Sequence, residues 1–235
     1  MRWLARDRAP SREVLDNWAR EAGLPQRFVA APGALSALDY ERRIASHGEI
    51  ATRDGVLHDL FNALSWLAFP RTKAALNAVH VREGASATGN ARNRRRDAAT
   101  LLDESGLIVA CADPSLIDGW RRHAWRETFW TRRADVERAL AAHALGHGLL
   151  EKLSNPYRSI TAQALVLSVP SSTSLADVDA VAADRIAAGV EPCALLPLPV
   201  AALPGWDSES LGIALFYDVA VFRAPRAAPA RGAQE

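Results

Sequence analysis

Hydrophobic and polar positions follow two different patterns along this chain, and the change falls near residue 155. Before it, apolar residues recur every three to four positions, as in the segment SREVLDNWAREAG, which begins with serine and ends with glycine. This spacing is typical of amphipathic helices, and serine and glycine are common at their two ends. We therefore expect helices over residues 11–23, 35–48, 58–69, 70–81, 92–106, 115–125 and 133–153, the last being the longest.

Shorter apolar runs predict strands. The run LIVAC at 107–111 fits a buried strand, and the later segments SITAQALVLSV (159–169) and LGIALFYDVAVFR (211–223) are rich in β-branched and aromatic residues. Between these two segments, residues 174–189 have the pattern of a helix that ends at a glycine. The expected fold class is α+β, predominantly helical, with a small β-sheet contributed mainly by the C-terminal third.

No repeat or flexible linker divides the chain. We expect a single globular α+β domain over residues 1–222 and a disordered tail at 223–235, where alanine, proline and arginine dominate. Whether residues 156–222 form a separate subdomain stays open at this point.

Composition narrows the functional classes. Of the 235 residues 49% are hydrophobic and 23% charged, and the formal net charge is +1, which argues against a nucleic-acid or anionic-membrane binder despite the run RNRRR at 92–96. The start of the chain lacks the apolar core of a signal peptide, and the apolar stretch CALLPLPVAALPGW is too short to span a bilayer. With Cys111 and Cys193 interpreted as reduced core residues, we expect a cytoplasmic protein with no membrane partner.

The segment HDLFNALSWLAFPRTK, which begins at His58, combines apolar composition with isolated polar residues. The eleven residues after Asp59 carry no charge. On a helical wheel His58, Asn62 and Ser65 fall on one stripe, and an exposed stripe would normally carry lysine, arginine or glutamate. We therefore expect this stripe to be covered and its polar groups to have partners, as a functional pocket or as a structural network with Asp59 as a helix cap.

Two predicted helices begin with basic residues. Arg71 and Lys73 follow Pro70, and Arg94 to Arg96 open the next helix. Helix N-termini favour negative charge by about 0.3–1 kcal/mol per group, so cations there indicate a nearby anion. That anion is either a ligand shared by the two helix starts or an acidic side chain of the protein.

Acidic and imidazole side chains add further candidates. Asp97 and Glu104 share one face of the helix at 92–106, where they suit acid–base chemistry, metal binding or a solvated surface. In HALGHGLLE, His143 and His147 are one helical turn apart and followed by Glu151, although the sequence is not HExxH. The alternatives are metal ligands and satisfied core histidines.

These segments together resemble a known family. In order along the chain, HDLFNALSWLAFPRTKAALNAVH, RRDAATLLDESG, GHGLLEKL, PLPVAALPGW and FYDVAVFR are similar to the bacterial family called domain of unknown function 3025, from about residue 40 to 223. The last segment has fewer acidic residues than the family pattern. The pair Glu151–Lys152 falls within a matching segment. The resemblance implies a shared set of site residues: His58, Asp59, Asn62, Arg71, Lys73, His80, Arg95, Asp97, Asp103, Glu104 and His147.

Two readings of function follow. The first is a hydrolase-type enzyme for a small anionic substrate, because titratable groups are dense in otherwise apolar segments. Its catalytic groups would be His58, Asp59, Asp97, Glu104 and His147. Its substrate-binding groups would be Asn62, Arg71, Lys73, His80 and Arg95. The second reading is a non-catalytic module that binds a ligand or a protein. Walker A, Rossmann and nucleophile-elbow motifs are missing, and the cofactor, the metal and the oligomeric state stay open.

Overall fold

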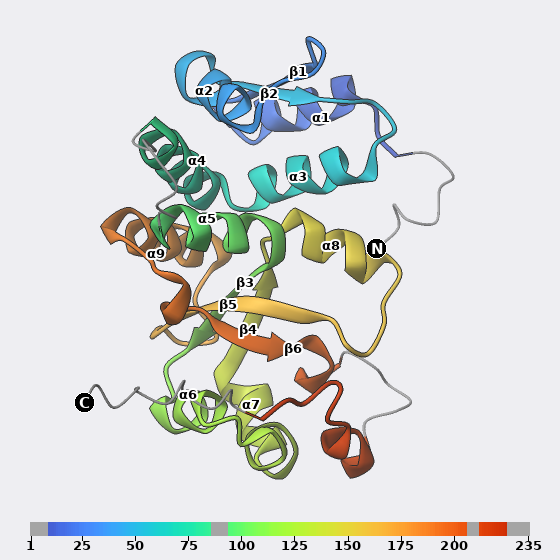
Figure 1. Cartoon of the computed structure of the whole chain (residues 1–235), viewed down its shortest axis with the longest axis vertical. Helices are drawn as coiled ribbons and strands as arrows, with labels where there is room; N and C mark the ends of the chain where they lie inside the picture. Colours follow the sequence, from blue (N-terminus) through green and yellow to red (C-terminus); the bar gives the residue numbers. More distant parts are fainter. Residues whose placement is uncertain (1–8, 86–93, 206–211, 225–235) are drawn as a thin grey trace, which may run out of the picture.

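The computed structural model describes residues 9–85, 94–205 and 212–224, and over these ranges the fold is α+β with helices predominating, as predicted. Figure 1 shows three parts stacked along the long axis: an N-terminal part, a layer of helices, and a four-stranded sheet with further helices beyond it. Apart from Arg223 and Ala224, the tail predicted at 223–235 lies outside the described residues. In the part of the chain that the structure describes, no helix is both long and apolar enough to cross a membrane.

The N-terminal part packs three helices around a pair of short strands. Its elements are α1 (Arg12–Glu21), β1 (Arg27–Ala30), α2 (Ala37–His47), β2 (Glu49–Thr52) and α3 (Leu57–Ala68). The strands are parallel, with Phe28 opposite Ile50, and both side chains are buried in one core with Ile44 and Trp66. The sequence did not predict these strands, because four residues are too few to establish an alternating pattern.

A layer of helices lies between the N-terminal part and the sheet (Figure 1). It contains α4 (Pro70–Ala85), α5 (Arg94–Ser105), α8 (His147–Ser154) and α9 (Leu175–Ala188). Pro70 occupies the first position of α4, where its missing N–H costs nothing. Because proline cannot continue α3, that helix ends at Ala68 and a new helix begins at Pro70.

The four-stranded sheet has the order β4-β3-β5-β6, with strands β3 (Gly106–Cys111), β4 (Leu140–Ala144), β5 (Thr161–Leu167) and β6 (Leu196–Pro199). Only the β3–β5 pair is parallel. Strand β3 is buried on both faces: Ile108 packs in the core shared with α4, α5 and α9, and Val109 packs in the core shared with α6 (Pro114–Arg121). This accounts for its unbroken apolar sequence.

The prediction of one long helix over residues 133–153 is wrong. The structure has α7 (Arg133–Ala139), strand β4, and then α8, which begins at His147. Strand β4 pairs with β3, with His143 opposite Ile108, so sheet pairing outweighs the helical pattern of this alanine-rich segment. His143 and His147 therefore do not share a helix face, and their spacing of one helical turn does not make them a pair of metal ligands, which was one of the two alternatives for them.

The prediction of a strand over residues 211–223 is also wrong. The described part of this segment forms a 3-10 turn at Ile213–Tyr217 followed by further turns, and its apolar residues Phe216 and Phe222 pack beneath the sheet. Strand β6 comes instead from the proline-rich segment before it, which an edge position tolerates. Cys111 is buried as expected, whereas Cys193 is exposed, contrary to its reading as a core residue.

Candidate functional site

A pocket of about 500 Å³ opens between the N-terminal part and the helix layer. Small and apolar residues of the β1–α2 connection form one wall, and acidic, imidazole and amide side chains form the other. The lining residues are Ala31, Gly33, Ala34, Leu35, Ser36, Ala37, Tyr40, Glu41, Ala51, Arg53, His58, Asp59, Asn62, Asp103, Glu104 and His147.

The first turn of α3 brings His58 and Asp59 to the pocket. Asp59 is buried and accepts hydrogen bonds from the backbone N–H and the guanidinium of Arg53, at 2.7 to 2.9 Å. Burial opposes ionisation of Asp59, but these bonds hold its pKa below the ordinary value. The carboxylate therefore fixes the β2–α3 connection rather than capping α3, and one of its oxygens lies 3.4 Å from Nδ1 of His58.

The start of α8 brings in His147, which is only 4% exposed. The glycines on either side permit its close approach to the end of α5. A Cβ atom at position 146 would lie 2.4 Å from the Gly106 nitrogen, and one at 148 would lie 2.8 Å from Oε2 of Glu104. Glycine is therefore required in the sequence GHG because no side chain fits between α8 and the α5–β3 junction.

Consecutive residues at the end of α5 present two carboxylates to His147. Oε1 of Glu104 lies 3.4 Å from its Nε2, and Oδ2 of Asp103 lies 3.9 Å from its Nδ1. Neither contact has hydrogen-bond geometry, so both ring nitrogens of His147 are buried without a hydrogen-bond partner among the described residues. The contact with His147 lowers the pKa of Glu104.

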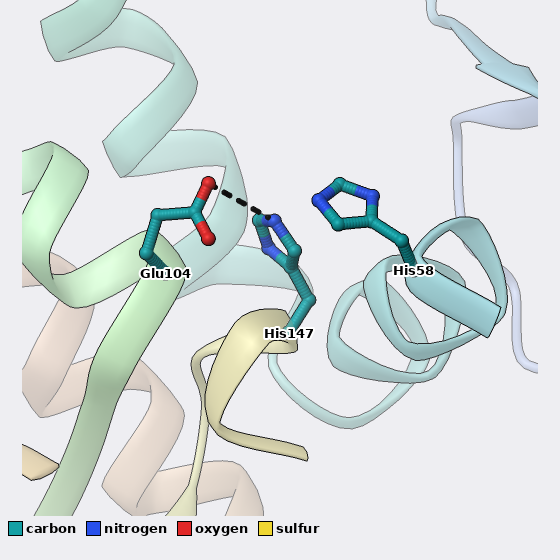
Figure 2. A group of neighbouring side chains, drawn as sticks. All are labelled: His58, Glu104 and His147. Carbon is teal, nitrogen blue, oxygen red and sulfur yellow. Dashed lines mark ion pairs between the residues drawn. The ribbon is translucent and has the colours of Figure 1, made fainter. Parts of the chain in front are cut away.

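His58 completes a cluster with Glu104 and His147 (Figure 2). The two imidazole rings meet edge to face with centres 4.3 Å apart, and one ligand atom from each of the three residues lies within 4.8 Å of the others. Figure 2 shows the outer edge of the His58 ring directed toward His147 and Glu104. Two imidazoles and a carboxylate in this arrangement have the donor set of a divalent metal site or of a general base.

A buried network supports the cluster from behind. The ammonium of Lys73, which is 4% exposed, forms an ion pair with Asp103 and donates to the side-chain oxygen of Asn62 at 2.9 Å. Asn62 in turn donates to the hydroxyl of Tyr40 at 2.9 Å. Burial opposes ionisation of Asp103, but Lys73 and then His147 lower its pKa. The positive charge of Lys73 is thus neutralised by Asp103 and is not directed at a substrate in the pocket.

Sequence reasoning missed Tyr40 and Glu41 of α2, which line the pocket. Burial raises the pKa of Glu41 to about 6, although Asn77 donates to its carboxylate at 2.6 Å. Burial also raises the pKa of Tyr40. Both residues fit an ordinary amphipathic helix, so nothing in the local pattern distinguished them.

The structure gathers some predicted site residues and disperses others. His58, Asp59, Asn62, Asp103, Glu104 and His147 line the pocket, and Lys73 and His80 lie behind it around a small void. Burial lowers the pKa of His80. Arg71, Arg95 and Asp97 are not among the lining residues; Asp97 is two helical turns from Glu104, about 10 Å along α5.

The two basic helix starts do not face a common anion, but the alternative of an acidic side chain of the protein is found at the start of α4, where Lys73 pairs with Asp103. Helices α4 and α5 run antiparallel, because Lys73 near the start of α4 meets Asp103 near the end of α5. The carboxylate of Asp179 from α9 accepts the backbone N–H groups of Arg71 at 3.0 Å and Thr72 at 2.8 Å. The start of α4 is therefore capped by the protein's own acid.

Comparison with protein-family models matches residues 26–226 to the family described as Protein of unknown function (DUF3025). The match spans most of the chain, so the chain belongs to this family, as the order of its motifs predicted. Neither the search of curated proteins nor the search of solved structures gave a match.

Proposed function

We propose that this member of the DUF3025 family is a hydrolase whose active site is the pocket around His58, Glu104 and His147. The observation that carries the proposal is His147, a buried imidazole with no hydrogen-bond partner among the described residues, which faces a second imidazole and a carboxylate. Buried polar groups are nearly always paired, so an unpaired one calls for an explanation, and a catalytic role is one such explanation. The cluster is suited to activating a water molecule.

Water as the nucleophile also agrees with the side chains around the cluster. The hydroxyl side chains that line the pocket are Ser36 and Tyr40. The Ser36 hydroxyl donates to Asp39 at 2.7 Å as part of the cap of α2, and the Tyr40 hydroxyl accepts from Asn62. Neither is paired with an imidazole, as a nucleophilic hydroxyl would be. Direct attack by water is therefore favoured over a covalent intermediate on either of these hydroxyl side chains.

The lining of the pocket indicates the kind of substrate. Ala34, Leu35 and Ala37 offer a shallow apolar wall opposite the polar cluster, which suits a small molecule with an apolar part next to the bond that is cleaved. Among the described residues, the lining holds four carboxylates and a single guanidinium, that of Arg53. An anionic substrate would therefore need a cation in the pocket, since Arg71 and Arg95 lie elsewhere.

Hydrolysis of a substrate panel by the full-length protein tests the proposal. The panel holds esters, phosphoesters, amides and lactams, and the protein variants are His58→Ala, Glu104→Gln and, as a control, His47→Ala on the exposed face of α2. We expect at least one substrate whose kcat falls about 100-fold or more in the first two variants and is unchanged in the control. Turnover that all three variants retain, or no turnover by the wild type, would count against a hydrolase.

A non-catalytic binding module is the second candidate, and one observation favours it. Asp59 accepts from Arg53, and Asn62 donates to Tyr40 and accepts from Lys73, so these side chains already serve as structural supports. In that case compounds from the same panel would raise the melting temperature of the wild type but not of the variants, without being hydrolysed.

A further inference from the structure

We infer that His58, Glu104 and His147 hold a divalent transition-metal ion, of which zinc, manganese and iron are the fitting members. The inference rests on the proposed function and deepens it, because it names what would activate the water. Two imidazoles and one carboxylate form a common donor set for these metals.

The spacing of the donors fits such an ion. Ligands about 2.1 Å from a tetrahedral zinc ion stand about 3.4 Å from one another. Nε2 of His147 and Oε1 of Glu104 are already 3.4 Å apart, and all three ligand atoms lie within 4.8 Å. The side chains of His58 and Glu104 are both about half exposed, and His58 lies in the first turn of α3, so rotation of these two side chains would close the remaining gap around the buried His147.

Burial of His147 is the independent observation. An imidazole that is 4% exposed, with both nitrogens lacking a hydrogen-bond partner among the described residues, is costly unless something else satisfies it. The glycines at 146 and 148 allow the backbone on either side of His147 to pack directly against Glu104 and the α5–β3 junction. A metal bound at Nε2 would satisfy the nitrogen that faces Glu104.

Each imidazole also has a carboxylate on its other side. Asp59 lies 3.4 Å from Nδ1 of His58, and Asp103 lies 3.9 Å from Nδ1 of His147. Each carboxylate is itself paired with a cation, Arg53 in the first case and Lys73 in the second. A negative charge on the Nδ1 side of a ring favours the tautomer with the proton on Nδ1, which leaves the lone pair of Nε2 for a metal; at 3.9 Å Asp103 would act on His147 through its charge and not through a hydrogen bond. Each histidine thus has a carboxylate beside its Nδ1, and the two carboxylates come from different helices, α3 and α5.

The charge of the pocket points the same way. Glu41, Asp59, Asp103 and Glu104 line it, and Arg53 is the cation among its described lining residues, so a dication relieves an excess of negative charge. Three protein ligands leave a position open toward the pocket, which is the arrangement of catalytic rather than structural metal sites. That position would hold the water.

Metal binding is measured on the full-length protein, purified without a histidine tag, stripped with chelator and titrated with Zn²⁺ or Co²⁺. We expect about one equivalent of bound metal by elemental analysis, and a cobalt absorption spectrum in the visible range. His58→Ala, in which an exposed side chain is removed and the fold is kept, should bind at least about 100-fold more weakly. The control His47→Ala should bind as the wild type does.

A conservative variant of Asp103 tests whether this carboxylate orients a metal-binding histidine or only stabilises the fold. Asp103→Asn should weaken metal affinity by about 10- to 100-fold and shift the cobalt spectrum, whereas a purely structural role would lower stability and leave the spectrum of the loaded protein unchanged.

The possible outcomes separate the two proposals. Less than a tenth of an equivalent in the wild type, or equal binding in His58→Ala, overturns the metal site. Hydrolysis by fully stripped protein also overturns it and leaves the hydrolase proposal standing. Stoichiometric binding that needs His58, without turnover of any substrate, supports the metal site and counts against the hydrolase.

Discussion

Lys73 and Asp103 form a buried ion pair that joins the start of α4 to the end of α5, directly behind His147. The Lys73 ammonium also lies 5.6 Å from the centre of the Trp66 ring, and Lys73 is only 4% exposed, so the pair is largely shielded from water. A pair of this kind is expensive to break, because removing one member leaves the other charge buried without a counter-charge.

Replacement of Lys73 by methionine should lower the free energy of unfolding by about 3–5 kcal/mol, because Asp103 is left buried and unpaired. Urea denaturation at pH 7 measures this. The double variant Lys73→Met, Asp103→Leu should recover much of the loss. The surface pair Arg133–Glu137 is the control, and Arg133→Met should cost about 1 kcal/mol or less. Equal losses at the two sites would contradict the importance of burial.

Glu41 should make stability depend on pH. Its pKa is raised from 4.5 to about 6, so the folded state binds a proton more tightly than the unfolded state does. Stability contributed by the protonated carboxyl is complete below pH 4.5 and is lost as pH rises through about 6. Glu41→Gln should therefore gain up to about 2 kcal/mol relative to wild type at pH 8 and nothing at pH 4. Thermal unfolding across this range measures the difference, and a gap independent of pH would contradict it.

Gly148→Ala should disturb the cluster more than the fold. Its Cβ would approach Oε2 of Glu104 to 2.8 Å and the Glu104 backbone oxygen to 2.9 Å, so the carboxylate must move. We expect hydrolysis or metal binding to fall by about tenfold or more, because a misplacement near 1 Å is costly at such sites. Gly212→Ala, where a Cβ has no atom within 4 Å, is the matched control. Identical activity in the two variants would show that Glu104 is not needed in this position.

Asp179→Ala should destabilise the protein by about 1–2 kcal/mol, because the first N–H groups of α4 lose their acceptor. The variant should also acquire a weak response to phosphate in thermal-shift assays, since the vacated helix start and Arg71 then offer an anion site. Wild type should show no phosphate stabilisation that depends on Arg71. A phosphate-induced stabilisation of the wild type that is lost in Arg71→Ala would contradict this prediction. It would show that Asp179 does not occupy the anion site at the start of α4.

The sequence predicted most helices and the covered character of α3, because both follow from local spacing. The lack of charge after Asp59 correctly indicated burial: Ser65 donates to the backbone oxygen of Leu145 at 2.7 Å, and Asn62 bonds to Tyr40. His58 is the exception, since its side chain is 46% exposed toward the pocket.

What the sequence could not supply depends on contacts between distant segments. The close approach that requires Gly146 is made to the α5–β3 junction, so in the sequence it looked like a tolerated glycine in a long helix. In the same way Asp179 caps a helix more than a hundred positions earlier in the chain, and no local pattern indicates such a partner. For this reason the sequence could not decide between a ligand and an acidic side chain of the protein at the basic helix starts, whereas the structure places Asp179 and Asp103 at the start of α4.

The histidines of the cluster belong to regions of the chain that build separate cores. His58 lies on the helix that packs with β1 and β2, whereas His147 follows Leu145 in the core of the sheet. The cluster therefore comes into existence only when the two regions have docked, and an ion held there would join them as a cross-link. If such an ion is bound, its removal by chelator should increase the rate at which backbone amides of these regions exchange with solvent. Protection should be lost first along α3.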